Sequence, residues 1–152
     1  MKLRILLLAL TFLTSLSAWA GKWEFLEQEG NQILMYTDGL GDSVSLICAS
    51  NAIPFVTITS VDTEFPEEGV TVSWKTNMVI GEPSVWSYLP NDSIASIIVA
   101  NPNLSRTIIQ VSGRSPDVAF AYSGKRFIVS TDGLKEIYPS FKKGCGYSWN
   151  TH

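Results

Sequence analysis

Histidine, the side chain that most often transfers protons near neutral pH, occurs once in this sequence of 152 residues, as the terminal His152. Ser-His-Asp and Cys-His catalysis both need that side chain held in a folded site, and chain ends are usually poorly held. A zinc site is also short of ligands, because the chain has only two cysteines. We therefore expect no catalytic residue, no metal ligand and no cofactor-binding residue.

Carboxylates are the remaining groups that could do chemistry. An acidic cluster occupies residues 62–68, but its spacing matches no EF-hand loop, and clusters of this kind are usually solvated turns. The same interpretation applies to Asp38 and Asp42, which enclose two glycines. A hydrolase that works with carboxylates alone stays as the competing hypothesis, and a Ser-Lys hydrolase is not refuted, although no motif supports it. The members of the cluster are Asp62, Glu64, Glu67 and Glu68.

The first twenty residues have the features of a secretory signal peptide. Lys2 and Arg4 precede an apolar run over residues 5–13, and Ala18-Trp19-Ala20 places small residues before the expected cleavage site. The run is far shorter than the ~20 residues that cross a bilayer, which disfavours a membrane anchor. We expect residues 1–20 to be removed and residues 21–152 to form a single periplasmic or secreted domain without a membrane span.

Loss of the leader makes the chain more acidic. The formal net charge changes from −3 to −5, because Lys2 and Arg4 leave with it. The remaining basic residues are scattered, whereas nucleic acid binding requires a positive patch. We therefore expect no nucleic acid partner.

Export also bears on the cysteines. In an oxidising compartment, two cysteines far apart in the sequence more commonly form a disulfide than a metal site or a redox pair. We predict a bond between Cys48 and Cys145, which would join the early strands to the C-terminal segment. On the chain-entropy model a loop of about 100 residues stabilises the fold by about 4.7 kcal/mol, an upper-range figure.

Period-two alternation with β-branched and aromatic residues dominates the chain from Lys22 onward and predicts strands bounded by turn residues. Residues 92–101 fit either a short helix or a strand, with the helix slightly favoured, and Asn101-Pro102-Asn103 is expected to end that element. The predicted strands cover residues 23–26, 33–36, 44–48, 55–58, 70–75, 85–89, 107–111, 118–122 and 127–129.

One convincing helix signal lies near the C-terminus. Leu134, Ile137, Tyr138 and Phe141 share one apolar face, and Gly144 follows the last turn. Pro139 is expected to kink or split this helix, because proline removes a hydrogen bond. Together these patterns predict a mainly β fold: an antiparallel β-sandwich with a C-terminal helix, one short additional helix and one disulfide.

The tryptophans divide into core and surface candidates. Trp74 alternates with Val70 and Val72, which places it in the core. Trp149 lies beyond the second cysteine, and together with Tyr147 it is our candidate for contact with a partner.

The run from Phe127 to Cys145, followed by Tyr147-Ser148-Trp149, resembles the closing strand, helix and cysteine of small exported bacterial proteins. The families concerned are the type VI secretion-associated periplasmic proteins and the invasion-associated locus B proteins. The earlier segments Leu46-Ile47-Cys48 and Val72-Ser73-Trp74-Lys75 fit the same ordered pattern. The resemblance implies a disulfide-linked β-sandwich that acts through protein contacts in the cell envelope, and it carries no catalytic residue.

The absence of catalytic groups, the export signal and this resemblance lead to one functional expectation. The chain is expected to be a non-enzymatic exported protein that binds another protein of the cell envelope, with a secretion system as one possible setting. Inhibition of a cell-wall hydrolase is the alternative within the binding class.

Overall fold

Antiparallel strands make up most of the described chain. The computed structural model describes residues 21–48, 54–91 and 94–145. The expected signal peptide and the proposed contact residues Tyr147 and Trp149 lie outside this range. The strands are β1 (Trp23–Gln28), β2 (Asn31–Thr37), β3 (Ser43–Cys48), β4 (Pro54–Ser60), β5 (Val70–Lys75), β6 (Ser84–Tyr88), β7 (Ser96–Val99), β8 (Asp117–Tyr122) and β9 (Lys125–Ser130), and the helices are α2 (Pro102–Ser112) and α3 (Leu134–Cys145).

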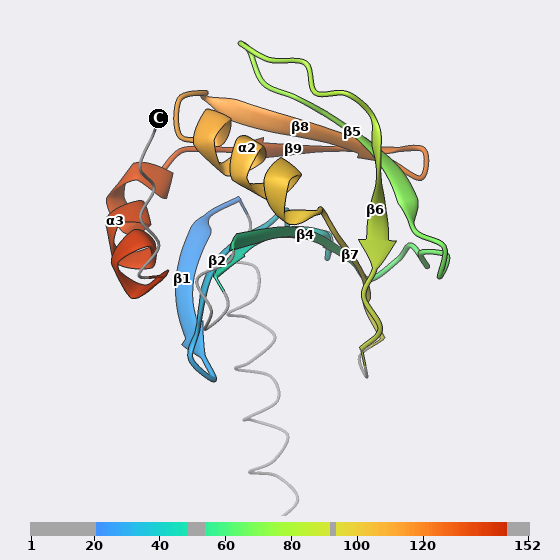
Figure 1. Ribbon diagram of the computed structural model, residues 1–152, viewed down its shortest axis with the longest axis horizontal. Helices are drawn as coiled ribbons and strands as arrows, with labels where there is room; N and C mark the ends of the chain where they lie inside the picture. The colour runs from blue at the N-terminus through green and yellow to red at the C-terminus, as the bar shows by residue number, and fades with distance from the viewer. Residues whose placement is uncertain (1–20, 49–53, 92–93, 146–152) are drawn as a thin grey trace, which may run out of the picture.

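The strands form one sheet in the order β1-β2-β3-β4-β7-β6-β5-β8-β9, with every neighbouring pair antiparallel. The sheet curls until its two ends meet (Figure 1). There Trp23 Nε1 donates a hydrogen bond of 2.7 Å to the Ser130 carbonyl, and the rings of Tyr36 and Phe127 lie 6.2 Å apart. The predicted mainly β, antiparallel fold is confirmed, and the layers that face each other across the core belong to one continuous sheet.

Short hairpins join the strands at the sheet's ends. Glu29 and Gly30 connect β1 to β2 with φ angles of 51° and 79°, and this pair of positive angles is typical of the tight turn whose twist matches the strands. Ser123 and Gly124 connect β8 to β9 in the same way, with φ angles of 47° and 73°. These turns set the register of two hairpins.

Two predictions between residues 92 and 112 are wrong. The favoured short helix within 92–101 is instead strand β7, and the predicted strand 107–111 lies inside α2. Asn101 begins this helix, since its side chain accepts a hydrogen bond of 2.9 Å from the Leu104 N–H, and Pro102 suits the first turn. The tripeptide 101–103 follows the end of β7, as expected, and it also starts α2, so the additional helix exists but begins at Pro102.

Helix α2 packs on strand β4. The Val56 N–H donates a hydrogen bond of 3.0 Å to Ser105 Oγ, which in turn donates to the Ala100 carbonyl at 3.2 Å. Ile108 and Ile109 are buried on the same side of the helix. Tertiary burial of this face thus outweighs the strand preference of its β-branched residues.

The predicted C-terminal helix is confirmed as α3. It packs on β1 and β2, burying Leu134 and Phe141. Pro139 lies inside the helix and does not split it. Proline removes one backbone hydrogen bond, but the other hydrogen bonds of the helix and the packing of its buried face keep it continuous. The predicted disulfide is also present: Cys48 pairs with Cys145, with Cα atoms 5.5 Å apart. None of the helices described is long and apolar enough to cross a membrane.

Candidate functional site

The acidic segment 62–68 does not converge on one point. Glu64, Glu67 and Glu68 lie exposed in the loop between β4 and β5, as expected for a solvated turn. Asp62 differs, because it forms an ion pair with Lys125. Among the described residues, no group of three or more acidic, cysteine or histidine side chains is placed to hold a metal ion.

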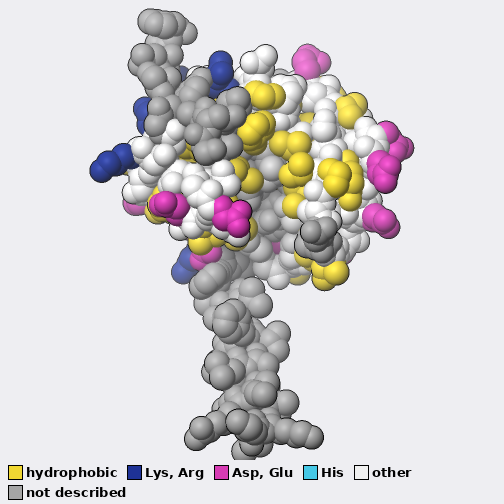
Figure 2. All heavy atoms as spheres, turned by 60° about the horizontal axis from the view of Figure 1, so that its bottom comes forward, with side chains coloured by type: hydrophobic (Ala, Val, Ile, Leu, Met, Phe, Trp, Pro, Cys, Tyr) yellow, Lys and Arg dark blue, Asp and Glu magenta, His cyan; other side chains and the backbone are white. Residues whose placement is uncertain are grey.

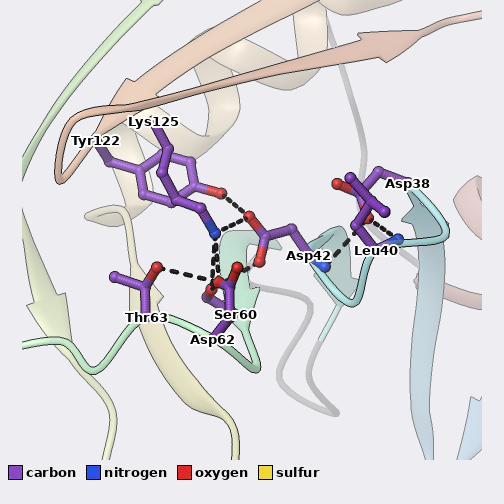
Figure 3. A network of polar contacts seen from close by, with 8 residues as sticks. All are labelled: Asp38, Leu40, Asp42, Ser60, Asp62, Thr63, Tyr122 and Lys125. Carbon is purple, nitrogen blue, oxygen red and sulfur yellow. Dashed lines mark hydrogen bonds and ion pairs between the residues drawn. The ribbon is translucent and has the colours of Figure 1, made fainter.

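The prediction that Asp42 lies in a solvated turn is wrong. Asp42 is only 6% exposed. Its carboxylate accepts hydrogen bonds from Ser60 Oγ at 2.6 Å, Tyr122 OH at 2.8 Å and Lys125 Nζ at 2.8 Å (Figure 3). Asp38 does have a turn role, since its carboxylate accepts the backbone N–H groups of Leu40 and Asp42. We call Asp42, Ser60, Asp62, Tyr122 and Lys125 the Asp42 network.

The Asp42 network shifts the pKa values of Asp62, Lys125 and Tyr122. Hydrogen bonds from Lys125 and then from Ser60 lower the pKa of Asp62 to about 2. Burial alone would lower the pKa of Lys125, but hydrogen bonds to Asp42 and Asp62 outweigh burial and raise it. Burial, followed by the hydrogen bond to Asp42, raises the pKa of Tyr122 well above its usual range. At neutral pH the network therefore holds charged Asp62 and Lys125 beside a neutral tyrosine.

This geometry bears on the Ser-Lys hypothesis. Lys125 Nζ lies 3.5 Å from Ser60 Oγ, a distance at which a neutral lysine could act as a base. The raised pKa of Lys125 keeps it protonated. Ser60 is only 1% exposed, and its single hydroxyl proton is shared between the carboxylates of Asp42 and Asp62, at 2.6 and 2.9 Å. The network thus ties the loop before β3, the end of β4 and the β8–β9 hairpin together, and this geometry does not favour Ser60 as a nucleophile.

A groove runs over the outer face of β8. The hairpin loop 76–83 continues β5 and is closed by the Gly81 N–H bond to the Trp74 carbonyl at 2.9 Å and by a bridge between Lys75 and Ile80. Two hollows of about 340 and 500 Å³ lie between this loop and β9. Both are lined by Lys75, Ile80, Ala119 and Arg126, so we treat them as one feature, the β8 groove.

The floor and sides of the β8 groove differ in chemistry. The small side chains of Ala119 and Ala121 form its floor. The exposed cations Lys75 and Arg126 extend from the neighbouring strands β5 and β9. Neither cation forms an ion pair within the described residues, where both ion pairs involve Lys125. The groove therefore holds two cations that form no ion pair within the described residues, with the carboxylate of Asp117 also in its lining.

Large apolar side chains project beside these cations. Ile80 is 84% exposed, Met78 is 67% exposed and Ile128 is 51% exposed, and all three line the groove. Contiguous exposed apolar side chains next to unpaired charges are typical of surfaces that contact another protein.

A second apolar surface lies on the outer side of the other half of the sheet. The register aligns Leu26, Ile33, Ile47 and Phe55 across β1 to β4, and all but Leu26 are partly buried. Figure 2 shows hydrophobic side chains gathered on the side that is lowermost in Figure 1, with acidic side chains along its right-hand border. Because this row is less exposed than Met78 and Ile80, we take the β8 groove as the candidate site.

Trp74 supports the groove from the inner side, and its predicted core position is confirmed by burial. Its ring lies against Gly81 so closely that a Cβ atom there would overlap the indole. We expect Gly81→Ala to lower the free energy of unfolding by about 1–3 kcal/mol, because overpacking displaces the ring or the loop. Chemical denaturation followed by tryptophan fluorescence measures the change.

The control for that substitution is Gly113→Ala. Gly113 has φ −64°, and the nearest atom to an added Cβ lies 3.9 Å away. We expect a change within about 0.5 kcal/mol at this position. Equal stabilities of the two variants would show that Gly81 is not confined by the indole.

The Asp42 network and the β8 groove were both missed by sequence reasoning, but the network left a signal. Asp42 has the same parity as the buried positions Val44, Leu46 and Cys48, which places it on the inner face. Parity gives Lys125 the same inward position, two residues before buried Phe127. No comparable signal marks the groove, because its lining comes from β5, β8, β9 and the loop 76–83.

Comparison with known protein families, with curated proteins and with solved structures finds no match for this chain.

Proposed function

We propose that this protein is exported to the periplasm or secreted, and acts without catalysis by binding another protein of the cell envelope. The observation that carries the proposal is the β8 groove, where exposed Met78, Ile80 and Ile128 lie beside Lys75 and Arg126. Neither cation forms an ion pair among the residues that the structure describes. A complex at this surface is stabilised most by a partner that buries the apolar side chains and places negative charge beside the two cations.

Two features support export. The first twenty residues have the charge and hydrophobic pattern of a cleaved signal peptide. The pairing of Cys48 with Cys145 fits an oxidising compartment, where such bonds persist. The resemblance to type VI secretion-associated periplasmic proteins and invasion-associated locus B proteins favours the same setting.

The Asp42 network supports a binding role over a hydrolase. A general acid or base works best with a pKa near the working pH. The pKa of Asp62 is lowered to about 2 and the pKa values of Lys125 and Tyr122 are raised, so all three move away from neutrality. The carboxylates of segment 62–68 are spread along an exposed loop, which does not favour a paired acid and base.

Co-purification from envelope extracts tests the proposal. We expect affinity-tagged protein to retain a specific partner in repeated trials, and a variant with both Met78→Ser and Ile80→Ser to lose it. These two side chains are exposed, so the double substitution should change stability little.

Leu40→Ser is the matched control, because Leu40 has the same 84% exposure as Ile80, lies in the turn before β3 and does not line the groove. We expect this variant to keep the partner. Failure to recover any specific partner, or equal recovery with all variants, would refute the proposed function at this surface.

A further inference from the structure

We propose that the β8 groove binds an extended polypeptide segment in which one carboxylate side chain is flanked by apolar side chains. This inference rests on the proposed function and specifies the chemistry of the partner.

The shape of the groove carries the first step. Its two hollows share four lining residues and follow the outer face of β8 from Asp117 to Ala121. A strand rises about 3.3 Å per residue, so this path is roughly 13 Å long and accommodates about four residues of extended chain. The small side chains of Ala119 and Ala121 let a second backbone approach the sheet closely.

The arrangement of charges carries the second step. The register pairs Lys75 with Ala119 and Arg126 with Ala121, so the cations stand on opposite sides of β8. Neighbouring strands are about 4.8 Å apart, which separates the two cation-bearing backbones by roughly 10 Å. Both long side chains can therefore reach one carboxylate held above the alanines. Arginine favours such a group in particular, because its planar fork donates two parallel hydrogen bonds.

The apolar walls carry the third step. Ile80 and Pro83 stand at one hollow, and Met78 and Ile128 stand at the other. A segment with its carboxylate between Lys75 and Arg126 would place its flanking side chains against these walls. Asp117, at the far end, disfavours a second acidic residue there.

The groove fits other anions less well. Nucleic acid would require a longer series of basic residues, whereas only two cations line these hollows. A small free carboxylate would satisfy the charges and leave the apolar walls uncovered. These ligands are therefore alternative outcomes of the experiment.

The test is a two-dimensional NMR titration of ¹⁵N-labelled protein, produced from the full-length chain, with the peptide acetyl-Leu-Val-Glu-Val-Leu-amide. We expect chemical-shift changes concentrated at Lys75, Ile80, Ala119, Ala121 and Arg126. Replacing the peptide's glutamate by glutamine should weaken binding about three- to tenfold, as expected for the loss of two exposed ion pairs. Sodium acetate at the same concentration should produce smaller changes.

The protein variant Lys75→Gln with Arg126→Gln should reproduce the effect of the glutamine peptide. A charge-matched control, Lys135→Gln with Lys143→Gln, alters two exposed cations on α3 and should leave binding unchanged. The inference would be overturned by equal binding of the two peptides or by equal effects of acetate and peptide. It would also be overturned if no chemical shift changed at the groove up to about 5 mM peptide, a limit that corresponds to a millimolar dissociation constant.

The co-purification experiment separates this inference from the proposed function. If the peptide fails while the Met78→Ser, Ile80→Ser variant still loses the partner, the groove binds protein of another chemistry. If both experiments fail, the groove is not the binding surface.

Discussion

Protein in which Cys48 and Cys145 are both replaced by alanine is expected to unfold with a free energy about 2–4 kcal/mol below that of the oxidised protein. The two cysteines are 97 positions apart, so their bond closes a large loop and lowers the conformational entropy of the unfolded chain. It also holds the end of α3 against the early strands, where Phe141 is fully buried. Urea denaturation of both proteins measures the difference.

Reduced wild-type protein is the control, because it loses the bond without a change in sequence. We expect it to match the double-alanine variant, and peptide mapping without reductant should recover one linked pair from exported protein. Two free thiols in exported protein, or a stability difference below about 1 kcal/mol, would contradict the stabilising role of this disulfide.

Asp42→Ala is expected to lower the free energy of unfolding by about 2–4 kcal/mol. The substitution leaves Tyr122 OH without its acceptor in a buried site and removes one of the two carboxylates that neutralise Lys125. Glu64→Ala removes an exposed carboxylate and should change stability by about 0.5 kcal/mol or less. Similar losses in the two variants would show that burial of Asp42 is not what makes it stabilising.

The pH dependence of unfolding provides a second check on the Asp42 network. Asp62 has a folded pKa of about 2 against 3.8 in the unfolded chain, so its contribution is present above pH 3.8 and is lost as the pH falls toward 2. Tyr122 and Lys125 have raised pKa values, so the folded protein binds more protons than the unfolded chain above about pH 10. Stability should therefore decline at both extremes, and less steeply at the alkaline end in Asp42→Ala.

Local sequence patterns predicted most strands because β-branched and aromatic residues recur there with a period of two. The alternation in β5, for example, follows Val70, Val72 and Trp74 directly. The C-terminal helix was predictable for the same reason, since Leu134 and Phe141 lie on one face. The disulfide followed from compartment and cysteine number rather than from any geometric signal.

The errors arose where local propensity and tertiary packing disagree. Thr107, Ile108 and Ile109 favour strands, yet all three are helical. The cap at Asn101 starts the helix, and the burial of Ile108 and Ile109 on the side that packs on β4 outweighs the local preference. Asp42 follows a glycine-rich turn, so its neighbours in the sequence favoured an exposed position. The alternation of β3 nevertheless places it on the inner face of the sheet. The β8 groove could not be predicted, because Lys75 and Arg126 become neighbours across β8 only through the pairing of strands far apart in the chain.

Site-specific photo-crosslinking in living cells tests the central claim most directly. A photoreactive amino acid replaces either Ile80, at the β8 groove, or Leu40, which has the same 84% exposure in the turn before β3. We predict a discrete protein adduct from position 80 and none from position 40. Equal adducts from both positions, or none from position 80 in repeated trials, would contradict a role for this groove in binding a protein partner.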